Sequence, residues 1–487
     1  TRSRRGGPLS LLSLGKKSSD LTKYNAVIFI RFLTISSKLE QTEERTPLIV
    51  EKKISLSTRL SYALGHIFND LAAAMWFSYT LIYLQRIALL EPINAGALLF
   101  LGQLVDALMT PVFGILVDRY SKKKIWHVIG SVLVTISFPI IFGSFADPLS
   151  PTAMFVYVTS ITVFQTGWAA VQISHLSMIP ALTDSSLVRA DLTAIRYSAQ
   201  VGAAVVVFIV TWIVLPTTEE SVVRLDQQDS YKFRNIVLVL TAVGVAATVF
   251  FHVFLKANLL DTTVATSLRK SRSENGLETP TKTGEYSRRQ QSWIGTSLLL
   301  RVALLYVASR LFITLATVYL PLYIEETDVG GKQALATVPL TSYLASFVAA
   351  LGLKYINRSC GTKVCYLLGA LIGISASTVT AFAGNYESVV YSVAVLIGAA
   401  SSVTMVTALS VTAEIIGPRT ESSALVYSIV TFLDKIITGI VVILIEKWRC
   451  VDTEICPNYN RDTLSLVCAS SMILGLVTLM SVARCLT

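Results

Sequence analysis

Long apolar segments separated by short polar loops make up most of the chain. A helix needs about 20 mostly apolar residues to cross the hydrocarbon core of a bilayer. Twelve segments of this kind are present, and the pattern therefore predicts an all-α membrane protein with twelve transmembrane helices. We expect these helices at residues 60–84, 93–117, 125–145, 153–176, 190–215, 235–256, 298–323, 334–355, 364–384, 388–411, 422–446 and 463–485.

Two polar stretches interrupt this pattern and predict the domain boundaries. Residues 1–56 are rich in Ser, Lys, Arg and Glu and predict a disordered tail. Residues 257–297 form a Ser-, Thr- and Arg-rich linker. We therefore expect two six-helix halves, at 57–256 and 298–487.

The composition agrees with a chain surrounded by lipid. Hydrophobic residues make up 53% of the 487 residues and charged residues 15%. Soluble domains contain about 25% charged residues. The composition thus excludes a disordered chain, a collagen, a disulfide scaffold and most soluble enzymes.

The net charge of +10 is spread over several loops. Basic residues concentrate in the tail, the linker and the loop that contains Arg119 and Lys122–Lys124. Excess Lys and Arg marks the cytoplasmic side of a membrane protein. We therefore expect the tail, the linker and both termini to be cytosolic, and the charge to set orientation rather than to bind nucleic acid.

A short repeat relates the two halves. The second span ends in Gly114, Asp118 and Arg119, and the eighth ends in Asn357 and Arg358. In both places the Arg is followed five residues later by a Lys. Charged residues at such helix ends are expected to form a salt-bridge latch that stabilises one conformation. The latch candidates are Asp118, Arg119 and Glu414.

Few ionisable side chains lie inside the predicted spans, and each one needs a physical reason. A charge at the centre of a membrane helix costs about 2.5–3.5 kcal/mol on insertion scales. His66 and Asp70 are four residues apart and share one helix face. A carboxylate beside a histidine can exchange protons near physiological pH. We expect this pair to take part in coupling; the alternative is a buried structural hydrogen bond.

Asp106 lies about one helical turn from both Gln103 and Thr110. Three polar groups on one face can hold a cation or relay a proton, so Asp106 and Thr110 join the coupling candidates. The alternative is that Asp106 forms an inter-helix hydrogen bond between the second and eleventh spans.

Lys435 lies deep in the eleventh span and needs a carboxylate partner to stay charged. The adjacent Asp434 points about 100° away on a helix and is a poor partner. Asp70 or Asp106, from the other half, is a better one. A carboxylate on one half and an ammonium on the other suit a zwitterionic substrate such as an amino acid.

Further substrate-binding candidates are an arginine in the fifth span, an arginine in the seventh and a histidine in the fourth. Arginine binds carboxylates through its planar guanidinium group, although either arginine can instead belong to a structural ion pair. With the residues already named, the proposed substrate-binding set is Asp70, Arg196, Lys435, Arg310 and His175.

The six-plus-six layout and the Gly114-to-Lys124 motif resemble the major facilitator superfamily. In such folds the substrate site lies near the bilayer midplane between the halves, which rock against each other. Longer strings resemble a lysosomal and melanosomal branch of this superfamily that is associated with cysteine import. These strings include SYALGHIFNDLAAAMWFSYTLIYL, LFLGQLVDALMTPVFGILVDR and VTAEIIGPRTESSALVYSIVTFLDK.

The chain is also similar, more distantly, to the glycoside–cation symporters. This resemblance implies a sugar-site role for Asp70 and Arg196 and a cation-site role for Asp106, and it matches Lys435 to the lysine of the eleventh helix in those symporters. Thr110 and Gln172 stand where those symporters have further carboxylates. Because hard cations prefer several charged oxygen ligands, the two replacements favour proton coupling or no coupling over sodium.

The predicted function is therefore secondary transport of a small polar solute, most specifically cysteine, from the cytosol into lysosomes or pigment organelles. A sugar or lysophospholipid symporter and a non-transporting receptor of the same fold remain alternatives. The tail adds an acidic dileucine pattern that resembles sorting signals read by adaptor complexes. Its residues are Glu44, Leu48 and Ile49.

No enzyme class is predicted, because the chain contains no Walker loop, His-Glu-x-x-His or Gly-x-Ser-x-Gly motif. We expect no cofactor and no metal, and a monomer in the bilayer. Cys450 and Cys456 fall in the last non-cytosolic loop, close enough in sequence to form a small disulfide.

Overall fold

The computed structural model describes residues 55–120, 122–145, 150–183, 186–215, 225–255, 296–384, 386–416, 420–450 and 455–483, and every regular element in these ranges is helical. The chain divides into two units, Thr1–Lys53 and Ile54–Thr487. The first unit, which contains the predicted sorting signal Glu44, Leu48 and Ile49, lies outside the described residues. Residues 256–295, which include most of the predicted linker, also lie outside them.

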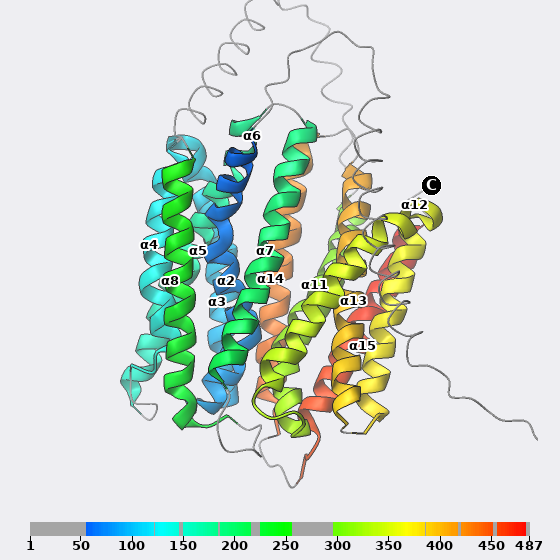
Figure 1. Cartoon of the computed structure of the whole chain (residues 1–487). Coiled ribbons are helices and arrows are strands. Elements are labelled where there is room, and N and C mark those ends of the chain that lie inside the picture. The colour runs from blue at the N-terminus through cyan, green and yellow to red at the C-terminus, as the bar shows by residue number, and fades with distance from the viewer. Residues whose placement is uncertain are drawn as a thin grey trace, which may run out of the picture. The chain divides into compact units, whose positions relative to one another are not determined.

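Six long helices form the first half of the second unit and match the first six predicted spans (Figure 1). A five-residue helix, α6 (Met178–Leu182), and a 3-10 turn, η1 (Gln227–Asp229), were not predicted because they are too short to leave a periodic pattern. The long helices are α2 (Leu56–Arg86), α3 (Pro92–Tyr120), α4 (Lys123–Phe142), α5 (Pro151–Leu176), α7 (Ser186–Val214) and α8 (Ser230–Phe254).

The second half matches the last six predicted spans, with one difference. The helices are α11 (Thr296–Thr327), α12 (Ala334–Phe382), α13 (Glu387–Ile416), α14 (Thr420–Lys447) and α15 (Tyr459–Ala483). The two predicted spans at 334–355 and 364–384 are both present within α12, as Ala334–Leu353 and Gly361–Phe382, and a kink at Gly361 takes the place of the expected loop. Gly361 alone leaves the helical conformation, at φ 79° and ψ 163°. Glycine tolerates that backbone region because it has no Cβ.

Local sequence explains where two of the helices begin. Ser55 precedes α2, and its side-chain oxygen accepts a hydrogen bond from the Thr58 N–H at 3.2 Å. Ser150 does the same for α5 toward Thr152, and Pro151 occupies the first helical position. Serine caps satisfy otherwise unpaired N–H groups, and proline fits the first turn because its missing N–H is not needed there.

Nine helical segments among the described residues are long and apolar enough to cross a membrane. They comprise α3, α4, α5, α8, α11, the two parts of α12, α13 and α15. Three further long helices, α2, α7 and α14, carry several of the polar residues singled out above. The candidate site residues are therefore divided between these three helices and the more apolar α3, α5 and α11.

The α2 helix lies in the interior of its half. Twenty of its 31 residues are buried, including Tyr62, Trp76 and Tyr83. By contrast, α3 and α5 expose large apolar side chains such as Ile115 and Phe155, as expected for surfaces that face lipid. Burial of α2 places its polar face against protein, away from lipid.

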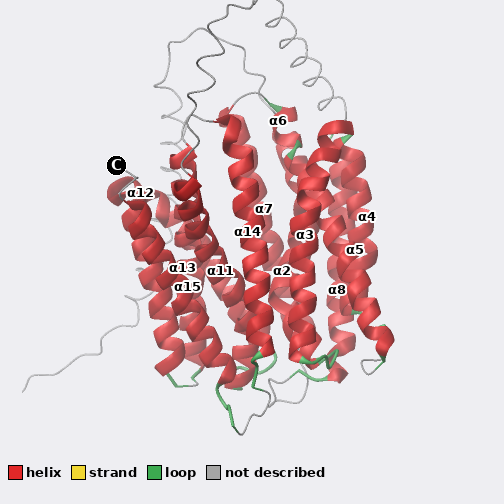
Figure 2. Cartoon of the chain, turned by 180° about the vertical axis from the view of Figure 1, so that it is seen from behind, coloured by secondary structure: helices red, strands yellow, loops and turns green. Residues whose placement is uncertain are grey.

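The helices run alternately up and down, as both views show (Figures 1 and 2). Two names for the ends of the helices are used below. The Leu56 end holds the start of α2 and the end of α3. The Arg86 end holds the end of α2, the start of α3 and the end of α14.

Candidate substrate and coupling site

A buried triad links α2 and α7 inside the first half. His66 Nδ1 lies 2.8 Å from Asp70 Oδ1, and Arg196 Nη2 lies 2.9 Å from His66 Nε2. Because a guanidinium can only donate, His66 Nε2 must be the acceptor. The imidazole proton then resides on Nδ1 and is donated to Asp70. The three predicted residues therefore form one continuous Arg–His–Asp hydrogen-bond chain.

The triad retains unused bonding capacity. Asp70 Oδ2 and Arg196 Nε are buried and have no hydrogen-bond partner among the described residues. Asn69 directly precedes Asp70 on α2. Its Nδ2 donates to the Trp168 carbonyl at 3.1 Å, and its Oδ1 has no hydrogen-bond partner among the described residues. Unpaired buried polar atoms are uncommon in folded proteins. This side of the triad is consequently suited to receive a polar ligand or a proton.

A second charged pair joins the two halves. Lys435 Nζ on α14 lies 2.5 Å from Asp106 Oδ2 on α3. The Thr110 hydroxyl lies 2.8 Å from the Asp106 carbonyl oxygen and 3.1 Å from Asp106 Oδ1, and it accepts from Lys435 at 3.4 Å. The side chains of Lys435 and Asp106 are 17% and 12% exposed, respectively. Of the two partners left open by the sequence, the structure selects Asp106 for Lys435.

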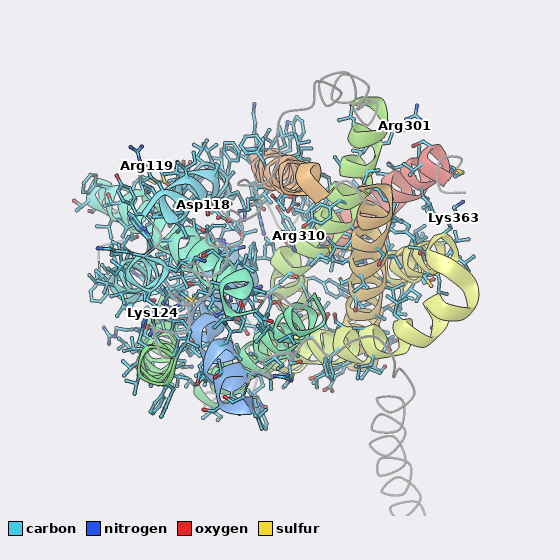
Figure 3. All side chains as sticks on the ribbon, turned by 90° about the horizontal axis from the view of Figure 1, so that it is seen from above. Asp118, Arg119, Lys124, Arg301, Arg310 and Lys363 are labelled. Carbon is cyan, nitrogen blue, oxygen red and sulfur yellow. A yellow bond between two sulfur atoms is a disulfide. The ribbon has the colours of Figure 1, made fainter. Side chains whose placement is uncertain are left out.

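The neighbouring Asp434 pairs within its own half. Arg310 Nε on α11 donates to Asp434 Oδ2 at 3.1 Å, and Thr438 donates to Asp434 Oδ1 at 3.3 Å. Asp434 and Lys435 therefore point to different partners, as the helical geometry predicts. Arg310 lies near the middle of the helices when they are viewed from the Leu56 end, whereas Arg301 and Lys363 lie toward the edge (Figure 3).

His175 lies beside the triad but is enclosed by α2. Its ring stacks on Tyr62 at a centroid distance of 4.2 Å, and its Nε2 lies 2.8 Å from the Tyr62 carbonyl oxygen. The centroids of His175 and His66 are 5.4 Å apart. His175 is fully buried. In this conformation it supports the α2–α5 contact near the triad and is closed to solutes.

Two histidines that the sequence did not single out belong to the same region. His127 Nε2 lies 2.7 Å from the Gly65 carbonyl oxygen, and His127 Nδ1 lies 3.1 Å from His252 Nε2. The His127 and His175 rings are 6.1 Å apart. All four histidines of the chain thus gather toward the Leu56 end of the first half. No helical spacing reveals this, because the four residues lie on four different helices.

The histidines do not form a metal site. Across the described residues, no group of three or more His, Cys, Asp or Glu side chains is arranged to hold a metal ion.

Two of the predicted latch residues, Asp118 and Arg119, lie at the Leu56 end of the first half, and the third, Glu414, lies near the end of α13 in the second half. Asp118 and Arg119 are exposed at the end of α3, and Arg119 lies farther from Arg310 than Asp118 does in the view from the Leu56 end (Figure 3). The Arg119 guanidinium lies 5.9 Å from the centre of the Tyr120 ring. The side chain of Glu414 is not among those that the structure describes.

Several bonds between the halves lie instead at the Arg86 end, and the sequence did not predict them. They connect Arg86 with Glu325, Gln85 with Glu446 and Asp229 with Lys332. In the loop that follows α14, Cys450 and Cys456 form a disulfide. The only hint in the sequence was the presence of acidic residues at the ends of two apolar spans.

Comparison with known proteins places this arrangement in a family. The sequence pattern of MFS/sugar transport proteins matches residues 61–446. Human major facilitator superfamily domain-containing protein 12 is 35% identical over 429 residues, which cover 83% of this chain and 88% of the human protein. The chain belongs to the MFS/sugar transport family.

A more remote relative is a symporter, and a solved structure shares the fold. A Bacillus subtilis symporter is 27% identical over 173 residues, covering 34% of this chain and 37% of the symporter. The structure of the inward-open Escherichia coli xylose transporter XylE aligns with a TM-score of 0.61 at 12% identity, covering 88% of this chain and 95% of XylE. As a member of the MFS/sugar transport family, the protein is a multi-pass membrane transporter and not an enzyme.

Proposed function

We propose that this transporter moves a small zwitterionic solute, specifically cysteine, from the cytosol into lysosomes or pigment organelles. The observation that carries the proposal is the Lys435–Asp106 ion pair, which links α14 to α3 across the two halves at 2.5 Å. An amino acid presents an ammonium and a carboxylate. It can therefore replace both members of this pair without leaving an unpaired charge.

The position of the pair connects binding to movement. Asp106 belongs to the first half and Lys435 to the second, so a solute that inserts between them changes the contact between the halves. Breaking a buried ion pair without replacing it costs about 3–5 kcal/mol. A zwitterion compensates both charges at once, whereas a neutral sugar leaves them unmatched. This difference supports an amino acid over a sugar as the substrate.

The Arg196–His66–Asp70 chain supplies a group for proton coupling. A histidine between a guanidinium and a carboxylate can shift its protonation with small changes in its surroundings. Asp70 Oδ2, which has no protein partner among the described residues, is the atom that we propose accepts the transported proton. Thr110, at a cation-site position in the related symporters, bonds to Asp106 through a neutral hydroxyl, which favours a proton over sodium.

The proposed direction and location rest on the sequence resemblance and on the dileucine pattern at Glu44, Leu48 and Ile49. With the tail, linker and C-terminus in the cytosol, the Leu56 end is cytosolic and the Arg86 end faces the organelle lumen. The proposed domain boundaries at residues 57–256 and 298–487 follow the same layout. Adaptor complexes are the proposed partners of the tail.

Uptake of labelled cysteine into isolated lysosomes, with and without this protein, tests the proposal at several lumenal pH values. We expect cysteine uptake to depend on the protein and to fall when the proton gradient is collapsed. Unlabelled xylose and lysophosphatidylcholine serve as competitors for the alternative substrates. Equal uptake with and without the protein would rule out cysteine, and competition by either alternative would favour that substrate.

A further inference from the structure

A disulfide closes the loop between α14 and α15. Cys450 follows the end of α14 and Cys456 precedes α15, at a separation of six residues. We propose that this disulfide is a thiol-exchange site that cysteine in the lumen reduces, and that its reduction slows transport. The inference rests on the proposed substrate and orientation, and it adds to them a regulation by the transported thiol.

The two cysteines lie where a dissolved thiol can reach them. Both are partly exposed, and the nearby Trp448 and Ile455 side chains are 72% and 75% exposed. By contrast, the free thiols of Cys365 and Cys468 are buried. Within the described residues, a thiol dissolved on this side of the membrane therefore meets the disulfide and not the buried thiols.

The exchange needs only the transported solute as reductant. The thiolate of one cysteine molecule attacks a sulfur of the disulfide, forms a mixed disulfide with it and displaces the other protein sulfur as a thiolate. A second cysteine thiolate then attacks the sulfur of the bound cysteine and releases cystine and the remaining protein thiolate. Two cysteine thiols are thus oxidised to one cystine while one protein disulfide is reduced. The two protein thiolates take up the protons that the two cysteines lost.

The residue next to the disulfide carries a buried charge. Arg449 directly precedes Cys450, and its Nη1 lies 3.1 Å from Glu446 Oε2. Its Nη2 donates to Asn460 Oδ1 at 2.9 Å. The side chains of Arg449 and Glu446 are 7% and 0% exposed. The guanidinium therefore joins the end of α14 to the start of α15 and balances a carboxylate that is closed to solvent.

The disulfide is the covalent part of this connection. The backbone N–H of Asn460 donates to Glu326 on α11 at 2.7 Å, and the Tyr459 hydroxyl donates to the Ile445 carbonyl at 3.0 Å. These bonds hold the start of α15, and the disulfide holds the segment that follows Arg449. After reduction only noncovalent bonds keep the guanidinium in its buried position, where it competes for its partners with water.

Release of the guanidinium affects the helix that carries the proposed substrate site. Without Arg449 the buried charge of Glu446 loses its counter-ion, which is strongly destabilising. Glu446 belongs to α14, the same helix as Lys435. A change at the end of α14 therefore reaches the Lys435–Asp106 contact along a continuous helix. Cysteine that accumulates in the lumen then slows further import of cysteine.

Thiol exchange is measured on the purified full-length protein, without transport. The protein is incubated with L-cysteine, and new thiols are counted by the mass shift with a maleimide. We expect Cys450 and Cys456 to become labelled at a rate that rises about tenfold per pH unit below the pKa of free cysteine, because the thiolate is the nucleophile. Cys365→Ser combined with Cys468→Ser should react equally fast. Absence of new thiols in both proteins would overturn the proposal.

Thermal unfolding of the same samples tests the link to the buried charge. Cysteine should lower the unfolding midpoint of the parent protein and leave that of Cys450→Ser combined with Cys456→Ser unchanged. Because this measurement also needs no transport, it tests the switch even if cysteine is not the substrate. An equal shift in both proteins, or no shift in either, would show that the disulfide does not control the structure.

Uptake into lysosomes tests the regulation itself. The double serine variant should take up labelled cysteine about fivefold more slowly than the parent, as expected for a lost hydrogen bond to a charged group. Preloading the lumen with unlabelled cysteine should slow the parent and leave the variant unaffected. Occupancy of the transport site by product would slow both proteins equally, and that result, or parent-like uptake by the variant, would overturn the regulation.

A variant outside the disulfide covers the case in which the double serine variant does not fold. Arg449→Gln keeps the disulfide and removes the guanidinium, so it should lower uptake to the same extent and make it insensitive to preloading. Parent-like uptake by Arg449→Gln would contradict the proposed link. Equal uptake with and without the protein would instead refute the proposed substrate, while the exchange and unfolding measurements would still decide the switch.

Discussion

The two hydrogen bonds of the His66 imidazole determine which of its ring nitrogens carries the proton. Arg196 donates to Nε2, and the ring therefore donates from Nδ1 to Asp70. A doubly protonated ring would lose the Arg196 bond, because two donors would then face each other. Protonation at this site thus alters the α2–α7 contact, which is the physical link between a proton and helix position.

The first prediction concerns this ring. His66→Gln removes the imidazole that connects Arg196 to Asp70 and keeps donor and acceptor atoms on the side chain. We expect cysteine uptake to lose most of its dependence on lumenal pH, because the glutamine side chain cannot pass a proton between its donor and acceptor atoms as an imidazole can. His252→Gln is the control, because His252 bonds to His127 and is remote from Asp70 along the cluster. A pH profile that stays the same in His66→Gln would remove His66 from the coupling path.

The second prediction separates binding from stability at the ion pair between the halves. Lys435→Ala leaves Asp106 without its ammonium, and we expect it to lower the free energy of unfolding by about 3–5 kcal/mol and to abolish uptake. Lys435→Met combined with Asp106→Leu removes both charges and should restore most of the stability. Thermal unfolding and uptake are measured in parallel. Uptake that returns with stability in the double variant would contradict a role in substrate binding.

At the scale of elements, α12 consists of two helices that meet at a kink at Gly361. The chain continues helically through the predicted loop, and only Gly361 departs, at φ 79°. No neighbouring atom lies within 4 Å of a Cβ built at this position. Any penalty for a side chain there therefore comes from the backbone conformation itself and not from crowding.

This leads to a third prediction, with a control in the same helix. Gly361→Ala should destabilise the protein by about 1–3 kcal/mol, the usual cost of holding a side chain in a sparsely populated backbone region. Gly352→Ala also meets no atom within 4 Å but lies in regular helix. It should be neutral or stabilise by about 0.5–1 kcal/mol. Thermal unfolding in detergent compares the two; an equal effect would show that the bend at Gly361 adapts without strain.

At the scale of the whole molecule, bonds between the halves occur at two levels. Lys435 and Asp106 meet partway along α14 and α3, and the contacts of Arg86 with Glu325 and of Gln85 with Glu446 lie at the ends of α2, α11 and α14. A substrate that breaks the first level leaves the second in place until the halves rotate. Two separate levels of contact therefore allow binding and opening to occur in order.

A fourth prediction tests the orientation of the molecule. Cys450→Ser frees Cys456 from the disulfide in the loop after α14, next to the Arg86 end. A membrane-impermeant maleimide should label Cys456 from the lumenal side only. Tyr120→Cys, at an exposed position of the Leu56 end, should be labelled from the cytosolic side only. Labelling in the reverse pattern would invert the proposed topology and the direction of transport.

Much of the fold follows from local sequence. Apolar length alone predicts twelve helices, because each backbone polar group in lipid must be paired within its own segment. The spacing of His66 and Asp70 predicts their shared face, and that of Asp434 and Lys435 predicts their separate partners. These relations hold within one helix, where geometry is set by a rise and rotation per residue.

Only the tertiary structure decided which helices meet and which charges pair. It assigned Lys435 to Asp106 rather than to Asp70, joined Arg196 to His66 and gathered four histidines from four helices. It also placed bonds between the halves at Arg86 and Glu325, away from the expected latch at Asp118 and Arg119. Such partners lie far apart in the sequence, and their choice depends on helix packing and burial, which hydrophobic periodicity along one segment does not encode.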